Sequence, residues 1–142
     1  MNTKSTEELM NVLINTDDTS VLENVLVETD DLKTSFSELV GSMLQEQNMT
    51  PADLQRKSGI ARTYIYQILD GTRNPGRDKV IAVALALKAD VDVAQRLLKV
   101  TGNAVLYPKD KRDAVIIFAI NKKMTVTDVN SLLESNGVEI LE

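Results

Sequence analysis

Hydrophobic positions recur along this chain mostly at the spacing of an α-helix. In the segment that begins at Ser35 they lie zero, three, four, seven and eight residues after Phe36, which places them on one helical face. These positions are Phe36, Leu39, Val40, Met43 and Leu44. No alternating pattern typical of strands is longer than Val138 to Leu141, and no repeat of fixed period is visible. The pattern predicts an all-α protein.

Turn residues predict two short helices after this first one. Thr50 can cap a helix whose first residue is Pro51, with an acidic side chain at Asp53, three residues after the cap. Gly59 can supply the positive φ of a tight helix exit. A further helix is expected from Ala61 to Leu69, with Ile65 and Ile68 facing inward and Asp70-Gly71 ending it.

The remaining chain predicts four more helices. The run 80–87 is apolar on most sides, so its helix should be central to the core. The expected boundaries of these helices lie at Pro75, Asp90, Gly102, Lys111, Thr125 and Gly137. The apolar run 113–120 is too hydrophobic for a free surface helix. It must pack on the chain's own core, which is the simpler case, or on another subunit.

Charge divides the chain into parts. Residues 1–35 hold eight acidic residues against two lysines, a net charge of −6, whereas the whole chain carries −5. Six basic residues against three acidic ones make 51–79 net positive by +3. We expect an acidic N-terminal helical segment at 1–34, a central helical domain at 35–102 and a C-terminal helical extension at 103–142.

The composition argues against most enzyme classes. The chain has no cysteine and no histidine, so it lacks thiolate zinc ligands, a thiol nucleophile and the usual general base. No glycine-rich phosphate loop or nucleophile elbow is present. We therefore expect that the protein is not an enzyme and that it binds neither a metal nor a cofactor. No apolar run approaches the ~18 residues that span a bilayer, so we expect a cytoplasmic protein without a membrane partner.

The two short helices joined by a glycine turn have the geometry of a helix-turn-helix, whose second helix lies in the major groove. The region 36–101 resembles the lambda-repressor-like, or Xre-type, family of DNA-binding domains. Matching positions are Thr50, Leu54, Gly59, Ile60, Arg62, Ile65, Ile68 and the ending Gly71-Thr72-Arg73-Asn74-Pro75. The resemblance implies a five-helix domain and a transcription regulator that binds double-stranded DNA.

Three positions differ from the family pattern. Pro51 stands where the family often has a phosphate-binding Gln, Gln55 where it usually has Ala, and Leu69 where it often has Glu. The first two bear on how the domain would dock on DNA more than on its fold.

Four residues on the exposed face of the helix at 61–69 are the candidates for reading bases: Arg62, Thr63, Tyr66 and Gln67. Arg can donate two hydrogen bonds to guanine, Gln can pair with adenine, and a Thr methyl or Tyr ring can contact the thymine methyl. Tyr64 is expected to lie over the preceding helix instead.

Basic and amide side chains around this helix are the candidates for phosphate contacts, which position a protein without reading sequence. They are Arg56, Lys57, Arg73, Asn74, Arg77 and Lys79. One recognition helix reads about half a site, so a homodimer is expected if the tail provides an interface. The alternative is a protein-interaction module, in which the acidic leader or the apolar tail binds a partner protein. A regulator could combine both, with the leader covering the basic face.

Overall fold

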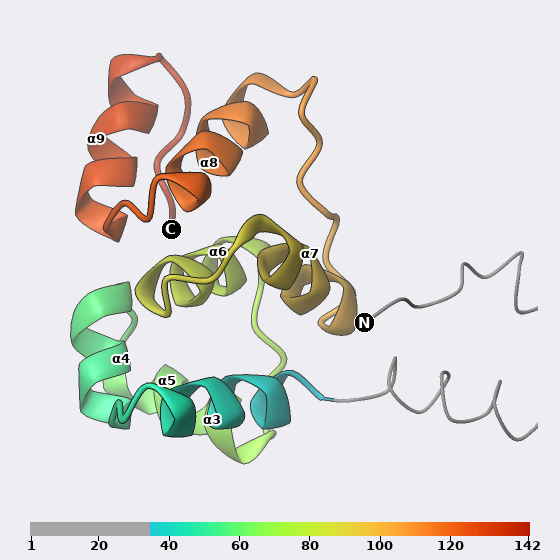
Figure 1. Ribbon diagram of the computed structural model, residues 1–142, viewed down its shortest axis with the longest axis vertical. Helices are drawn as coiled ribbons and strands as arrows, with labels where there is room; N and C mark the ends of the chain where they lie inside the picture. The colour runs from blue at the N-terminus through green and yellow to red at the C-terminus, as the bar shows by residue number, and fades with distance from the viewer. Residues whose placement is uncertain (1–34) are drawn as a thin grey trace, which may run out of the picture. The chain divides into compact units, whose positions relative to one another are not determined.

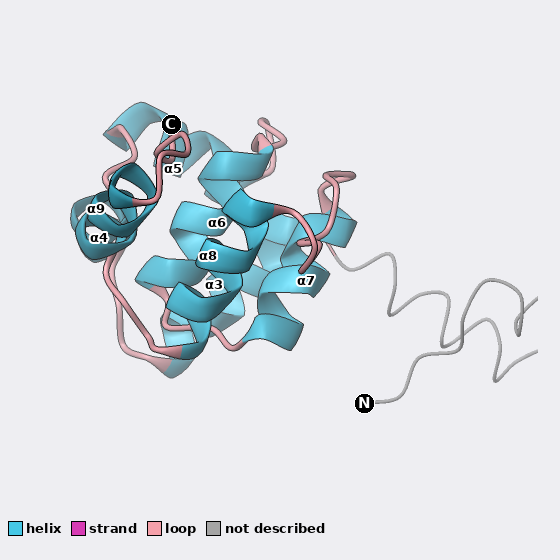
Figure 2. Cartoon of the chain, turned by 90° about the horizontal axis from the view of Figure 1, so that it is seen from above, coloured by secondary structure: helices cyan, strands magenta, loops and turns pink. Residues whose placement is uncertain are grey.

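A computed structural model describes residues 35–142, and the helices expected within 1–34 lie outside the described residues. The described part contains seven α-helices and no strand (Figures 1 and 2). The helices are α3 (Phe36–Glu46), α4 (Pro51–Ser58), α5 (Arg62–Asp70), α6 (Arg77–Ala86), α7 (Val91–Val100), α8 (Lys111–Asn121) and α9 (Val126–Ser135). The all-α expectation is confirmed.

The expected capping residues begin the helices because their side chains accept the first unpaired backbone N–H groups. Thr50 and Asp53 form a reciprocal capping box at α4: the Thr50 hydroxyl accepts from the Asp53 N–H, and the Asp53 carboxylate accepts from the Thr50 N–H. Asp90 and Thr125 cap α7 and α9 in the expected positions. Ala61 is the N-cap residue of α5 and its side chain cannot accept a capping hydrogen bond. The helix runs from Arg62 to Asp70, one residue later at each end than expected.

Three pairs of consecutive helices are joined by turns of the same type. Each turn contains a non-glycine residue with positive φ: Asn48 at 54°, Lys88 at 53° and Lys123 at 56°. The next N–H in each turn bonds the carbonyl five residues back, in the pairs Met49–Leu44, Ala89–Ala84 and Met124–Ala119. The hairpins α3–α4, α6–α7 and α8–α9 thus have the same turn at unequal intervals, which a search for a fixed period does not find.

Helix α6 forms the centre of the fold. Figure 1 shows α6 and α7 between the layer of α3 to α5 and the hairpin α8–α9. Every residue from Val80 to Leu87 is buried, as the uniformly apolar run predicts.

The C-terminal hairpin packs on the same core. Ile116, Ala119 and Ile120 are buried in it, whereas Phe118 is 52% exposed. The apolar run therefore packs on the chain's own core. The segment Ser35–Glu142 forms one compact unit, within which the division at residue 102 stays a prediction. None of the helices in the described part is long and apolar enough to cross a bilayer.

Candidate nucleic-acid interface

The turn between α4 and α5 is held by short-range contacts. Gly59 adopts φ 75°, in the left-handed region where a side chain would be strained. The buried Ser58 hydroxyl accepts a hydrogen bond from the Ile60 N–H at 3.2 Å. Ile60 is itself buried and anchors the turn to the core. These contacts fix the direction in which α5 leaves the turn.

Helix α5 separates a buried face from a solvent-facing one. Ile65 and Ile68 are each 1% exposed and face the core, as expected. Arg62, Thr63 and Tyr66 are exposed, and Gln67 is partly buried. The Arg62 guanidinium lies 5.4 Å from the centre of the Tyr66 ring. The structure thus exposes three of the four base-reading candidates on α5, whereas Gln67 is only partly accessible.

Two basic residues that follow α5 lie beside the ring of Tyr64. The Arg73 guanidinium lies 4.6 Å from its ring centre, and the Lys79 ammonium lies 5.8 Å from it. The Tyr64 hydroxyl accepts a hydrogen bond from the Gly76 N–H at 3.2 Å. These contacts lie in the segment after α5 and in the first turn of α6, and the expected position of the ring over the preceding helix stays a prediction. Two of the candidate phosphate-contact residues therefore lie beside the same aromatic ring.

The basic residues of α4 differ in their partners. Arg56 pairs with Asp53 at 3.1 Å on the exposed surface. The Thr50 N–H donates to the Asp53 carboxylate and, together with Arg56, holds the pKa of Asp53 below its ordinary value. Lys57 is exposed and forms no ion pair with any residue of 35–142. Lys57 therefore keeps a charge that no described carboxylate compensates.

Two other phosphate candidates are engaged inside the molecule. The Asn74 amide donates to the Thr101 carbonyl at 2.8 Å, at the end of α7. The Arg77 guanidinium donates to both carboxylate oxygens of Asp113, at 2.9 and 2.8 Å, and to the carbonyls of Ala104 and Val105. Both side chains thus hold the segment after α7, and the structure does not bring them into the cluster around Tyr64.

A second ion pair joins the same two helices, α6 and α8. Arg112 donates to both oxygens of Asp78, at 3.1 and 2.9 Å. The consecutive pairs Arg77-Asp78 and Arg112-Asp113 lie in the first turns of α6 and α8 and bind each other crosswise. Asp78, Arg112 and Asp113 were not among the candidate site residues. The sequence feature that could have pointed to them is the Arg-Asp dipeptide, which occurs at 77–78 and again at 112–113.

Comparison with known protein families agrees with this geometry. Residues 41–93 match the family model described as helix-turn-helix, of the Xre or lambda-repressor-like kind. The match runs from α3 into α7 and confirms the resemblance, so this segment is a helix-turn-helix domain of a DNA-binding family. Comparisons with curated proteins and with solved structures give no match. Within 35–142, no cluster of acidic residues is arranged to hold a metal ion.

Proposed function

We propose that this protein is a transcription regulator that binds double-stranded DNA sequence-specifically, with α5 in the major groove. The observation that carries the proposal is the outer face of α5, where Arg62, Thr63 and Tyr66 are exposed within the helix-turn-helix segment. A helix in this position presents its N-terminal residues to base edges. Arg62 and Thr63 are the first two residues of α5.

The chemistry of this face suits base reading. Arg62 can donate two hydrogen bonds to guanine, and Gln67 can pair with adenine. The Tyr66 ring lies close to the Arg62 guanidinium, and such a contact restricts a flexible cation before binding. Because fewer side-chain conformations are then lost on binding, the contact favours recognition.

Four cations remain suited to phosphate: Arg56, Lys57, Arg73 and Lys79. They flank α5 on both sides in sequence, and three of them form no ion pair with a described residue. The exception is Arg56, whose ion pair is exposed and therefore weak. We leave Arg77 and Asn74 out of this set because both bind backbone carbonyls inside the molecule.

Salt dependence of duplex binding tests the proposal. Neutralising about four phosphates gives a slope near −3.6 for log K against log salt, so raising salt from about 50 to 200 mM should weaken binding about a hundredfold. Fluorescence anisotropy with a labelled duplex measures this. Genomic fragments selected by the purified protein should then bind more tightly than a random duplex. Negligible affinity at both salt concentrations would overturn the proposal.

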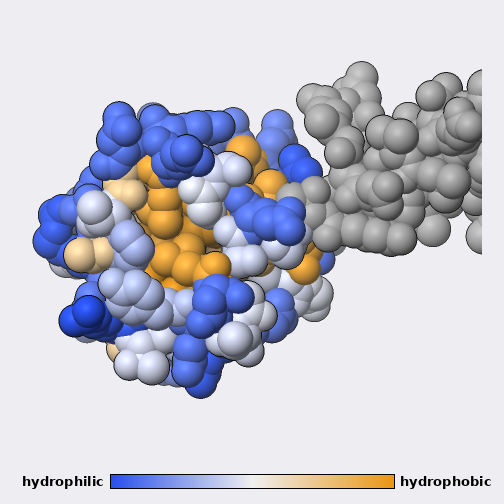
Figure 3. Space-filling view, turned by 90° about the horizontal axis from the view of Figure 1, so that it is seen from below, coloured by the Kyte–Doolittle hydropathy of each residue, from blue (hydrophilic) through white to orange (hydrophobic). Residues whose placement is uncertain are grey.

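Exposed apolar side chains favour a second candidate, a protein-interaction module on the same scaffold. Tyr107 is 56% exposed and Phe118 52% exposed in the C-terminal part. Figure 3 shows a further hydrophobic patch, ringed by polar residues, on the face seen from below. Such patches mark protein contacts, including those of a homodimer. Sedimentation velocity distinguishes a dimer from a monomer, and the salt titration above separates this candidate from the first.

A further inference from the structure

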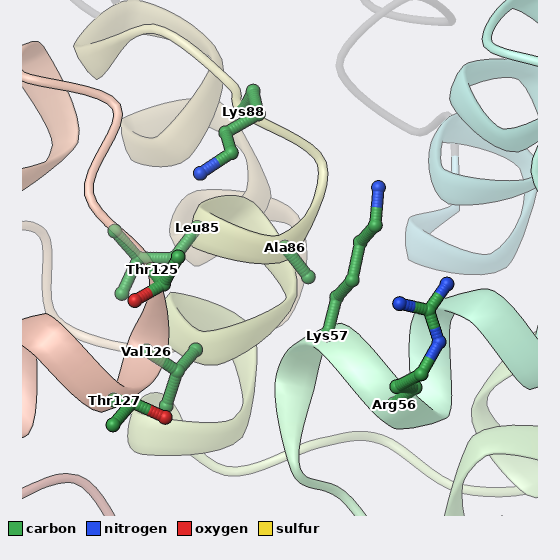
Figure 4. Close-up of a pocket in the computed structure, with 8 residues that line it drawn as sticks. All are labelled: Arg56, Lys57, Leu85, Ala86, Lys88, Thr125, Val126 and Thr127. Carbon is green, nitrogen blue, oxygen red and sulfur yellow. The ribbon is translucent and has the colours of Figure 1, made fainter.

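A cavity lies where the helix-turn-helix meets the C-terminal hairpin. It has a volume of about 360 Å³ and is bounded by the end of α4, the end of α6 and the start of α9. Figure 4 shows Arg56 and Lys57 on one side, Leu85 and Ala86 along α6, and residues 125–127 opposite them. Cavities that bind small molecules have volumes of about 300 to 1,000 Å³, so this one has the size of a ligand site.

The cavity is lined by three cations and no carboxylate: Arg56, Lys57 and Lys88. Arg56 also pairs at 3.1 Å with Asp53, which lies outside the lining, so Lys57 and Lys88 carry most of the argument from charge. Lys57 forms no ion pair with any described residue. The Lys88 ammonium donates to the Lys123 carbonyl at 2.7 Å, a neutral acceptor that leaves the positive charge uncompensated. Like charges gathered beside a surface of low polarity attract an anion more strongly than isolated ones do.

The remaining lining is apolar with two hydroxyl groups. Leu85 and Ala86 are buried and form the α6 wall, and Val126 on α9 is partly buried. The Thr127 hydroxyl makes no hydrogen bond within 35–142, and Thr125 accepts one from the Asp128 N–H, which leaves its own proton available to donate. A ligand here meets cations, hydroxyl donors and an aliphatic wall together.

We propose that this cavity binds a small organic phosphate, a phosphate monoester carrying an apolar body. The dianion would lie among Lys57, Lys88 and Arg56, and the apolar body against Leu85 and Val126. This combination matches ligand sites in general, which pair an apolar lining with a few polar groups that fix orientation. The proposal does not rest on DNA binding, although two of these cations also belong to the proposed phosphate contacts.

An NMR titration of the full chain tests it, with phenyl phosphate, inorganic phosphate and phenol as probes. Phenyl phosphate should give saturable shifts at the amides of Leu85, Ala86, Val126 and Thr127, with a dissociation constant of about 1 mM or lower. Inorganic phosphate should bind more weakly because it leaves the aliphatic wall unused. Phenol, which carries no charge at neutral pH, should bind more weakly as well.

Matched variants separate the cavity from general attraction to a basic surface. Lys57→Gln should weaken phenyl phosphate binding about threefold, whereas Lys99→Gln, at an exposed lysine of α7 outside the cavity, should leave it unchanged. Val126→Trp should fill the cavity and remove binding, provided that circular dichroism shows an intact fold. Absence of saturable shifts, equal binding of both phosphates, or equal effects of the two lysine variants would overturn the proposal.

Discussion

Arg77 and Asp113 lie 36 residues apart in sequence and form a two-pronged ion pair, with both guanidinium NH groups bound to the carboxylate at 2.9 and 2.8 Å. The side chain of Asp113 is 8% exposed and that of Arg77 25%. The Tyr107 N–H donates to the same carboxylate at 3.0 Å. The pair therefore ties α6 of the helix-turn-helix to α8 and to the segment that leads into it.

This contact involves an arginine that was a candidate for phosphate contact in the sequence analysis. Four of the five N–H donors of Arg77 are taken by Asp113 and two backbone carbonyls, so its guanidinium is engaged inside the molecule. The crosswise pair of Arg112 and Asp78 reinforces the junction. The C-terminal hairpin is thus joined to the helix-turn-helix by charge pairs as well as by the shared core.

Replacing Asp113 by Asn should destabilise the protein. One of its oxygens becomes an NH₂ group that faces the Arg77 donors, so at least one charge-assisted hydrogen bond is lost and the partly buried Arg77 cation loses its anionic partner. We expect a loss of about 2 to 3 kcal/mol in the free energy of unfolding, measured by urea denaturation.

The matched control for this change is Glu134→Gln, which alters an exposed carboxylate of α9 that takes part in no ion pair among the described residues. Its free energy of unfolding should stay within about 0.5 kcal/mol of the parent. Similar losses in both variants would show that Asp113 contributes no more than an ordinary surface charge.

Stability should fall in acid through the same junction. Burial raises the pKa of Asp113, but hydrogen bonds from Arg77 and the Tyr107 N–H outweigh this effect and hold the pKa below its ordinary value. Burial likewise opposes the bonds from Arg112 that lower the pKa of Asp78. Because both folded-state pKa values lie below the unfolded ones, this stabilisation is complete above the unfolded value of about 3.9 and is lost as pH falls below it.

Urea denaturation between about pH 5 and pH 2 measures this dependence. The Asp113→Asn variant cannot titrate at that position, so its free energy of unfolding should fall less steeply with acid than that of the parent. Parallel curves for parent and variant would argue against a depressed pKa at Asp113.

Arg62→Ala tests the assignment of base reading. The fold should be retained because Arg62 is exposed. Binding to the selected site should weaken by about 1 to 3 kcal/mol, the range for one two-pronged base contact. Anisotropy titrations of the selected site and a random duplex measure the difference, with Lys99→Ala as the control. Unchanged affinity for the selected site would remove Arg62 from the base-reading set.

Arg73→Ala and Lys79→Ala test the phosphate assignment. Each should weaken binding to all sequences alike and reduce the salt slope by about one, because one fewer phosphate is neutralised. The two side chains share the Tyr64 ring, so the double variant is expected to deviate from additivity. A loss confined to the selected sequence would place these residues among the base readers.

Deleting residues 1–33 should raise the affinity for duplex DNA. The segment carries eight acidic residues and two lysines, so its removal changes the net charge from −5 to +1. Repulsion of phosphate by that charge is strongest below about 0.1 M salt, where the Debye length exceeds about 10 Å. The compact unit Ser35–Glu142 remains whole, so circular dichroism should show a folded protein. A folded variant with equal or weaker affinity at low salt would contradict the prediction.

The helices and their caps follow from the sequence because they depend on residues a few positions apart. Thr50, Pro51 and Asp53 predict the start of α4, and the structure shows the capping box there. The apolar run 80–87 predicts a central helix for the same reason, since a helix without a polar face must be covered on all sides. The division of α5 into a buried and an exposed face also follows from its 3.6-residue period.

Only the tertiary structure decided which of the candidate phosphate-contact residues are engaged inside the molecule. Nothing in the sequence separates Asn74 and Arg77 from Arg73 and Lys79 as candidates for phosphate contact. In the structure, Asn74 and Arg77 bind partners 27 to 36 residues away. The contacts of Tyr64 with Arg73, Gly76 and Lys79 were likewise not predicted from the sequence. Periodicity and capping depend on residues a few positions apart in the chain. The partner of a long charged side chain depends instead on which distant helix packs beside it.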